Sequence, residues 1–174
     1  METRSERWLE QLYESYATPV HRYALRRVSR DAAEEIVAET FVVAWRRFAQ
    51  VPDNPLPWLY AVARRLVANH RRSDNRRHAL LTRLGDSAPH TSYSPADSGL
   101  RESLATLRHS DREALLLVAW EGLSTAELAV ALGCTEVAAR ARLHRARRRL
   151  RAAMSADHDQ PLTQAREVCD GSAG

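Results

Sequence analysis

Residues 124–145 read STAELAVALGCTEVAARARLHR, and this stretch predicts two helices joined by a tight turn. Ser124 and Glu127 have the spacing of a capping box, in which the two side chains satisfy backbone N–H groups of the first helical turn. Ala129 is small where two helices would cross, and Gly133 permits the left-handed conformation of a sharp turn. The stretch therefore predicts a helix-turn-helix, although a generic pair of helices around a glycine turn remains an alternative.

The second helix of this pair extends to about Met154, and its arginines have no acidic residue among them. We expect it to expose Arg140, His144, Arg145 and Arg147. A helix of this kind fits the major groove of DNA, where Arg bonds guanine O6 and N7 together. The arginines from 148 onward are better placed to neutralise phosphate than to read bases.

The whole chain has 174 residues, of which 44% are hydrophobic and 28% charged, as in a globular protein. Its 26 basic residues are all arginine and outnumber 22 acidic residues, giving a net charge of +4. A second cluster of arginines lies at residues 64–77 and is opposed only by Asp74. Two one-signed clusters indicate two contacts with a polyanion, whereas two solvated faces in an arginine-rich composition are the alternative.

Helical periodicity dominates the first half of the chain, which we expect to form a domain over residues 1–84. One helix covers about 5–17, and Thr18 and Pro19 indicate the start of the next. Asp31 and Glu34 resemble a capping box that opens a helix to about Phe48. Prolines within 51–57 must end it, and Asn54 is the expected cap of the following helix.

Residues 85–99 are polar and interrupted by proline, which predicts a flexible linker. Helices are expected at about 100–107 and 111–120, the latter with Ser110 and Glu113 as a capping box. We therefore predict an all-α protein of two small helical domains, with the helix-turn-helix in the second, at 100–154. The acidic tail, 155–174, is expected to be disordered.

Several classes of function are disfavoured by what the sequence lacks. It has no apolar run of about 18 residues and no apolar leader, so we expect no membrane insertion and a cytoplasmic location. His70, Asp74 and His78 have a spacing that could hold a metal, but the surrounding arginines disfavour a dication. No nucleophile–base set or glycine-rich phosphate loop occurs, so we expect no enzyme activity, no cofactor, no metal and no small-molecule substrate.

Three motifs in order carry a family resemblance. Residues 32–46, AAEEIVAETFVVAWR, resemble a signature of bacterial sigma factors of the extracytoplasmic-function group, in the sigma-70 family. Residues 57–72, PWLYAVARRLVANHRR, resemble the promoter-melting helix of that family, and the helix-turn-helix resembles its fourth-region DNA reader. The resemblance covers roughly residues 8–154 and implies a chain that contains only the second and fourth conserved sigma regions.

The resemblance implies a sigma factor that binds core RNA polymerase and directs promoter recognition, strand opening and transcription initiation. It further implies a cognate anti-sigma factor as a partner. The implied polymerase contacts are Glu35, Glu39 and Arg46. The implied contacts to the −10 promoter element are Asn54, Trp58, Arg64, Arg65, Asn69, Arg71 and Arg72. The implied contacts to the −35 element are Thr135, Arg140, Arg142, His144, Arg145 and Arg147.

Two other functions remain open on the sequence alone. A stand-alone helix-turn-helix repressor or activator would bind duplex DNA without polymerase and would use residues 1–80 for dimerisation or effector binding. An adaptor that binds only proteins is disfavoured by the arginine run on the final helix. For Trp58, burial against Val62 competes with a role as a stacking face for an unpaired base.

Overall fold

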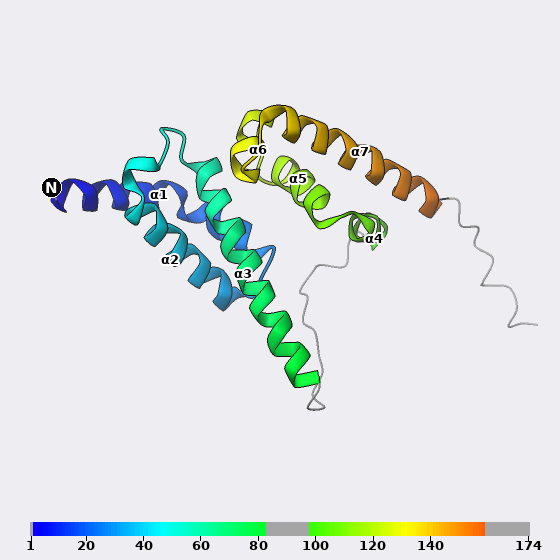
Figure 1. Ribbon diagram of the computed structural model, residues 1–174, viewed down its shortest axis with the longest axis horizontal. Helices are drawn as coiled ribbons and strands as arrows, with labels where there is room; N and C mark the ends of the chain where they lie inside the picture. Colours follow the sequence, from blue (N-terminus) through cyan, green and yellow to red (C-terminus); the bar gives the residue numbers. More distant parts are fainter. Residues whose placement is uncertain (1, 83–97, 159–174) are drawn as a thin grey trace, which may run out of the picture.

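A computed structural model describes residues 2–82 and 98–158, and every regular element in these ranges is helical. The N-terminal unit consists of α1 (Glu2–Leu25), α2 (Arg30–Arg46), the short 3₁₀ helix η1 (Phe48–Gln50) and α3 (Leu56–Thr82). The C-terminal unit consists of α4 (Ser98–Thr106), α5 (His109–Ala119), α6 (Thr125–Leu132) and α7 (Glu136–His158). Figure 1 shows α1–α3 as one bundle, with α6 beside the upper part of α3 and the rest of the C-terminal unit beyond α6.

The all-α prediction is confirmed, but the predicted break at Thr18 and Pro19 is wrong. Helix α1 continues through Pro19, because Val20 and Tyr23 carry its buried face onward and each is fully buried. A proline inside a helix costs about 3 kcal/mol, and burying large side chains against α2 and α3 offsets that cost.

Two predicted capping boxes are also wrong. Helix α2 begins at Arg30, two residues earlier than expected, after Ser29, whose side chain makes no capping hydrogen bond. Helix α5 begins at His109, so Glu113 lies inside the helix, where its side chain turns to the N-terminal unit. In both cases the local spacing fitted a cap, but the helix begins two residues before the position that the cap implied.

Asn54 does not cap α3 as expected. The N–H of Leu59 donates to the carbonyl of Pro55 (2.8 Å), which places Pro55 just before the first helical residue. The Asn54 side chain instead donates to Glu127 of α6 (3.0 Å). The predicted linker at 85–99 lies outside the described residues except for its last two, which open α4, and α7 continues to His158 before the undescribed remainder of the tail.

The buried hydrophobic residues form one continuous cluster that spans both units. Ile36, Phe41 and Leu59 belong to the N-terminal part, and Leu117 and Leu128 to the C-terminal part. Helices α3 and α6 meet across the boundary, so the two units are packed on each other rather than held apart. This packing decides which arginines of α3 face solvent.

Candidate nucleic-acid interface

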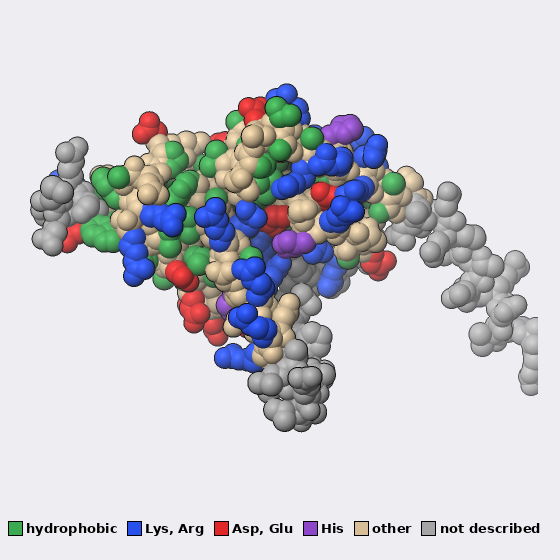
Figure 2. Space-filling view, in the orientation of Figure 1, with side chains coloured by type: hydrophobic (Ala, Val, Ile, Leu, Met, Phe, Trp, Pro, Cys, Tyr) green, Lys and Arg blue, Asp and Glu red, His purple; other side chains and the backbone are tan. Residues whose placement is uncertain are grey.

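Helix α3 presents an arginine face because its apolar residues are drawn to the opposite side. Leu59, Ala63 and Val67 are buried at helical spacing, which turns Arg65 and Arg72 to solvent. Figure 2 shows basic side chains over α3 and, on the same face of the molecule, along the C-terminal unit. The predicted −10 contacts that remain exposed on α3 are Arg65, Asn69 and Arg72, and Arg72 donates a hydrogen bond to Asn69.

Two other arginines of α3 are already bound to the protein. Arg64 donates to the backbone carbonyls of Ala131 (3.1 Å) and Leu132 (3.2 Å) at the end of α6. Arg71 donates twice to the carbonyl of Arg27 (2.8 and 3.2 Å), and its partial burial lowers the pKa of its guanidinium. Both side chains therefore satisfy carbonyl groups near helix ends that would otherwise lack partners.

The loop before α3 holds the other two predicted −10 contacts. Asn54 is exposed, and its amide is within hydrogen-bond distance of the Glu127 carboxylate. Trp58 is half-buried against the core cluster, as the burial alternative predicted, so only part of its ring is open to solvent. The structure thus brings Asn54 and Arg64 to the boundary with α6 but leaves Arg65 and Asn69 outside it.

The helix-turn-helix of the C-terminal unit forms as the sequence predicts. The Glu127 N–H donates to Ser124 Oγ (3.3 Å), and the Ser124 N–H donates to Glu127 Oε2 (2.9 Å), which confirms the capping box. Hydrogen bonds to the Glu127 carboxylate from the Ser124 N–H, from the Ser124 hydroxyl (2.7 Å) and from Asn54 lower the pKa of Glu127. Gly133 ends α6 with φ +67°, the left-handed conformation expected of it.

Helix α7 presents its predicted contacts on an open surface. Ala139, Leu143 and Ala146 are buried at helical spacing, and Arg145 and Arg147 lie on the exposed side. The predicted set divides by exposure as follows: Thr135, Arg140, His144, Arg145 and Arg147 are exposed, and Arg142 is half-buried. Thr135 Oγ1 accepts from the Ala138 N–H (3.2 Å), and Arg140 pairs with Glu136 (2.8 Å), so these two also have roles within the helix.

Sequence reasoning missed one side chain on this surface. Val137 lies in the first turn of α7 and is 75% exposed, the highest value among the exposed large hydrophobic residues. An apolar side chain at the start of a recognition helix can contact the methyl group of thymine. The sequence could have indicated this exposed side chain, because a branched apolar residue stands between Glu136 and Arg140 on a helix face that is otherwise polar.

The predicted polymerase contacts lie together on α2. Glu35, Glu39 and Arg46 are all exposed, one or more helical turns apart. Val42 (44% exposed) and Phe48 (44% exposed) lie along the same part of the chain, and the Phe48 ring meets Trp8 edge-on with centroids 4.6 Å apart. The surface thus combines carboxylates with exposed apolar groups, which is a composition suited to a protein partner.

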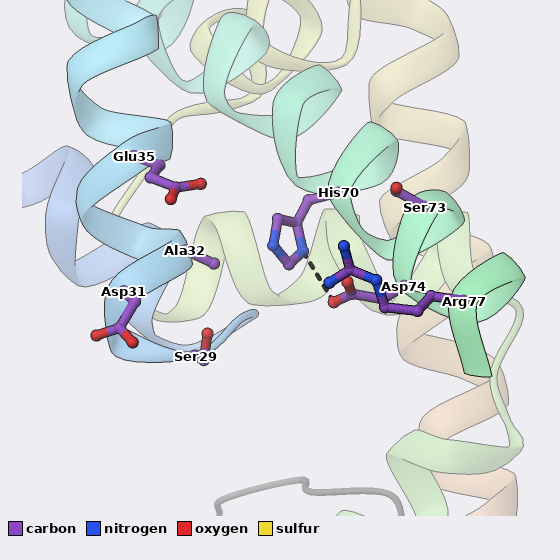
Figure 3. A pocket seen from close by; sticks show the side chains of 8 residues that line it. All are labelled: Ser29, Asp31, Ala32, Glu35, His70, Ser73, Asp74 and Arg77. Atoms are coloured by element: carbon purple, nitrogen blue, oxygen red, sulfur yellow. Dashed lines mark ion pairs between the residues drawn. The ribbon is translucent and has the colours of Figure 1, made fainter. Parts of the chain in front are cut away.

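A surface hollow of about 490 Å³ separates the start of α2 from the later turns of α3. Figure 3 shows Glu35 of α2 pointing across the hollow toward His70 of α3, with Asp74 and Arg77 next to His70. His70 Nδ1 lies 3.1 Å from the Asp74 carboxylate. Within the described ranges no group of three His, Cys, Asp or Glu side chains is arranged to hold a metal ion, and the side chain of His78 lies outside them.

A buried polar contact between α1 and α5 was not predicted. The Tyr23 hydroxyl donates to Glu113 Oε1 (2.8 Å), and Arg27 Nε donates to Glu113 Oε2 (3.3 Å). Burial, and then the Glu113 carboxylate, raise the pKa of Tyr23, which keeps the hydroxyl protonated as a donor. A carboxylate one turn before Leu117, on the buried side of an apolar helix, was the signal that a buried partner was needed.

A second carboxylate reinforces this contact from the loop after α5. Glu121 pairs with Arg26 (2.6 Å) and lies 3.7 Å from Arg27, and it accepts a hydrogen bond from the Tyr60 hydroxyl (3.4 Å). The Arg26 guanidinium also lies 5.3 Å from the centre of the Trp120 ring. We refer to the contacts that Glu113 and Glu121 make with α1 and α3, through Tyr23, Arg26, Arg27 and Tyr60, as the closure contact.

The two arginine surfaces can bind a polyanion at two places. No helix among the described residues is long and apolar enough to cross a membrane. A model of sigma-70 region 2 matches residues 12–77, and a model of sigma-70 region 4 matches residues 99–150. These matches coincide with the two units and with the two arginine-bearing helices.

Two similar proteins are named ECF RNA polymerase sigma factors. The ECF RNA polymerase sigma factor SigL of Mycobacterium tuberculosis is 32% identical over 151 residues, which cover 80% of this chain and 85% of SigL. The ECF RNA polymerase sigma factor BldN of Streptomyces coelicolor is 34% identical over 151 residues, covering 80% of this chain and 57% of BldN.

Solved structures share the fold. The sigma factor RpoE of Bartonella quintana, in complex with the anti-sigma factor NepR, superposes with a TM-score of 0.62 at 24% identity, over 85% of this chain and 97% of that one. CnrH, in complex with the cytosolic domain of CnrY, gives a TM-score of 0.60 at 24% identity, over 87% and 90%. At this identity the likeness concerns the arrangement of helices.

Proposed function

The chain belongs to the ECF group of sigma-70 RNA polymerase sigma factors, and we propose on that premise which unit binds polymerase and which promoter element each unit recognises. A sigma factor gives core RNA polymerase its promoter specificity and takes part in opening the start site. The N-terminal unit then holds the polymerase and the −10 element, and the C-terminal unit reads the −35 element. The domain limits are 1–84 and 100–154, with a linker at 85–99 and a tail at 155–174.

We assign the polymerase contact to the exposed face of α2. Its carboxylates, Glu35 and Glu39, suit a basic partner helix, and Arg46 extends the contact toward η1. The neighbouring apolar side chains Val42 and Phe48 supply area that charged groups alone lack. This face lies on α2, whereas the arginines assigned to DNA lie on α3, so one unit can hold protein and DNA together.

Single-stranded −10 DNA is assigned to α3 and the loop before it. Unstacking a base costs a few kcal/mol, so a site must receive the base and neutralise the adjoining phosphates. Asn54 supplies amide hydrogen bonds and the open part of Trp58 a stacking surface. The strand then follows Arg64, Arg65, Asn69, Arg71 and Arg72.

The −35 element is assigned to α7, inserted in the major groove of duplex DNA. Arg140 and Arg145 lie one helical turn or more apart on the exposed face and are the base-reading candidates. Thr135, Arg142, His144 and Arg147 complete the contact surface. Each contact alone is weak and salt-dependent, and tethering both to one polymerase makes the second effectively intramolecular.

Further partners follow from the family. The similar structure of RpoE from Bartonella quintana, which is a complex with the anti-sigma factor NepR, supports a cognate anti-sigma protein for this chain. We propose that the chain acts in the cytoplasm, where polymerase and chromosome are found, and that it is a DNA-recognition protein without enzyme activity, cofactor or small-molecule substrate. The observation that carries the whole proposal is that each sigma-region match contains its own exposed arginine-bearing helix.

Run-off transcription tests the proposal. Purified core RNA polymerase, the full chain and a library of genomic fragments are combined, and the start sites are sequenced. We expect discrete start sites that share two spaced elements and that are absent when either protein is omitted. A chain that binds closed duplex DNA tightly at cellular salt, yet fails to associate with core polymerase, would instead be a stand-alone helix-turn-helix regulator.

A further inference from the structure

Charged and polar side chains of the two units meet at the boundary between them. The closure contact occupies one end of this boundary, and two further contacts join α3 and its preceding loop to α6. Asn54 bonds Glu127, and Arg64 bonds the carbonyls that end α6. Asn54 and Arg64 are also residues to which we assign promoter DNA, so α6 occupies part of the DNA-facing surface of the N-terminal unit.

The carboxylates of the closure contact are buried because the two units are closed. The side chain of Glu113 is 8% exposed and that of Glu121 is 4% exposed, as is that of Arg27. Hydrogen bonds from Tyr23 and Arg27 satisfy Glu113, and Arg26, Arg27 and Tyr60 surround Glu121. A carboxylate buried in this way is stable only while its cationic partners face it.

A buried ion pair fixes one arrangement of two surfaces more than it adds net stability, because desolvation offsets most of the attraction. Opening the boundary would return both carboxylates to water, together with Arg26, Arg27 and Arg64. DNA phosphates could then replace the carboxylates as partners of Arg26 and Arg27. The contact is therefore suited to a closed state that a polyanion or a protein partner can displace.

We propose that Glu113 and Glu121 hold the free chain closed, so that α6 covers the promoter-facing part of α3 until the two units separate. The occupant of the covered surface is the C-terminal unit of the same chain. The closure itself does not depend on the function assigned above, whereas the consequence for DNA rests on it. In contrast, the reading face of α7 stays open in the closed state.

Small-angle X-ray scattering of the full chain tests the closure. In the double variant Glu113→Gln and Glu121→Gln the carboxylate charge is lost while the shape is kept, and we expect a larger radius of gyration than in the wild type. Glu102→Gln is the matched control, because Glu102 is an exposed acid of the same unit on α4. Circular dichroism checks that helix content is retained. An unchanged radius in the double variant would overturn the closure role of the two carboxylates.

A charge exchange makes the pairing itself testable without relying on the glutamine variant. Arg26→Glu places like charges opposite each other and should enlarge the radius of gyration. Adding Glu121→Arg restores an opposite-charge pair at the same place and should reduce it again. If the second substitution fails to restore compactness, the pairing between residues 26 and 121 does not hold the units together.

The consequence for DNA is measured with a mixed-sequence single-stranded oligonucleotide and the free chain, without polymerase. If about nine-tenths of the molecules are closed, opening them raises the apparent affinity about tenfold, because affinity scales with the competent fraction. The glutamine double variant should show that gain, and Glu102→Gln should match the wild type. A larger radius with unchanged affinity would overturn the covering of the DNA-facing surface. Failure in the transcription test with success here would instead reject only the sigma function.

Discussion

Helices α3 and α7 carry similar arginine-rich sequences, yet the structure uses the two sets of arginines differently. On α7 the side chains of Arg145 and Arg147 are exposed, and Arg140 pairs with Glu136 one turn away on the same helix. On α3, Arg64 and Arg71 are bound to backbone carbonyls of other elements. Arg145 and Arg147 are thus available ligands, whereas Arg64 and Arg71 are structural donors.

The difference teaches that arginine density alone does not identify a free nucleic-acid surface. Guanidinium groups have five donors in a fixed arrangement, and carbonyls at helix ends are strong acceptors. Where a neighbouring helix ends nearby, as α6 does beside Arg64, the protein satisfies the arginine itself. Where the side chain lies on an open face, as at Arg145 and Arg147 of α7, it is available to an external anion, whereas Arg149 of the same helix pairs with Asp111 of α5.

The largest expected effect is on transcription, when an exposed arginine of α7 is removed. Arg145→Ala removes a candidate base contact, and one two-point contact to guanine contributes about 1–3 kcal/mol of discrimination. We expect transcription from promoters that need the −35 element to fall by roughly a factor of ten or more in a run-off assay. Core-polymerase binding in a pull-down should not change. Arg22→Ala, an exposed arginine of α1 outside both surfaces, is the control, and an equal loss in that variant would remove the distinction.

The second prediction concerns the arginines bound to backbone carbonyls and their effect on the free energy of unfolding. Arg71→Ala removes two hydrogen bonds from a charged donor and leaves the Arg27 carbonyl without them. The free energy of unfolding in urea should fall by about 1–2 kcal/mol. The adjacent residue provides the control: Arg72 is exposed, and Arg72→Ala should lie within about 0.5 kcal/mol of the wild type. Equal effects of the two substitutions would mean that Arg71 has no structural role.

Local signals in the sequence were sufficient where one element determines the outcome. The turn at Gly133 and the capping box at Ser124 both form as predicted, since each depends only on residues within one or two helical turns. The continuation of α1 through Pro19 could not be predicted in the same way. It depends on the burial of Val20 and Tyr23 against helices that are distant in the sequence.

The candidate site shows the same limit. Exposure of the α7 face follows from helical periodicity, because Leu143 and Ala146 fix the buried side. The fate of Arg64 does not, because its partners are the carbonyls of residues 131 and 132 in another unit. Glu113 fitted a capping box with Ser110, but only the tertiary structure shows that its partners are Tyr23 and Arg27.

The third prediction tests how sharply the C-terminal unit depends on its turn. Gly133 has φ +67°, and a β-carbon built there meets nothing within 4 Å. Gly133→Ala should therefore cost about 1 kcal/mol of stability through backbone strain alone. Gly133→Asn should recover part of that loss, since asparagine tolerates the left-handed conformation. Thermal unfolding of both variants provides the measurement, and equal stability of alanine and wild type would contradict it.

The smallest expected effect is a difference in stability between the start of α6 and the start of α2 as the pH falls. Hydrogen bonds from Ser124 and Asn54 lower the pKa of Glu127 below its ordinary value of 4.5, so the folded state favours the carboxylate. The stabilisation from Glu127 is thus present above about pH 4.5 and is lost as the pH falls through the lowered pKa of the folded chain. In α2, Ser29 makes no capping hydrogen bond, so its helix start lacks a capping box that depends on a carboxylate.

Amide hydrogen exchange resolves this contrast by helix. Between pH 6 and about pH 3.5, protection at the start of α6 should decrease relative to the start of α2, once intrinsic exchange rates are divided out. Glu127→Gln removes the titrating carboxylate and should abolish the difference. Because Glu127 also accepts from Asn54, acid weakens one of the contacts that join α6 to the N-terminal unit. A decrease that persists in Glu127→Gln would have to arise from another carboxylate, and the capping box would then not be its cause.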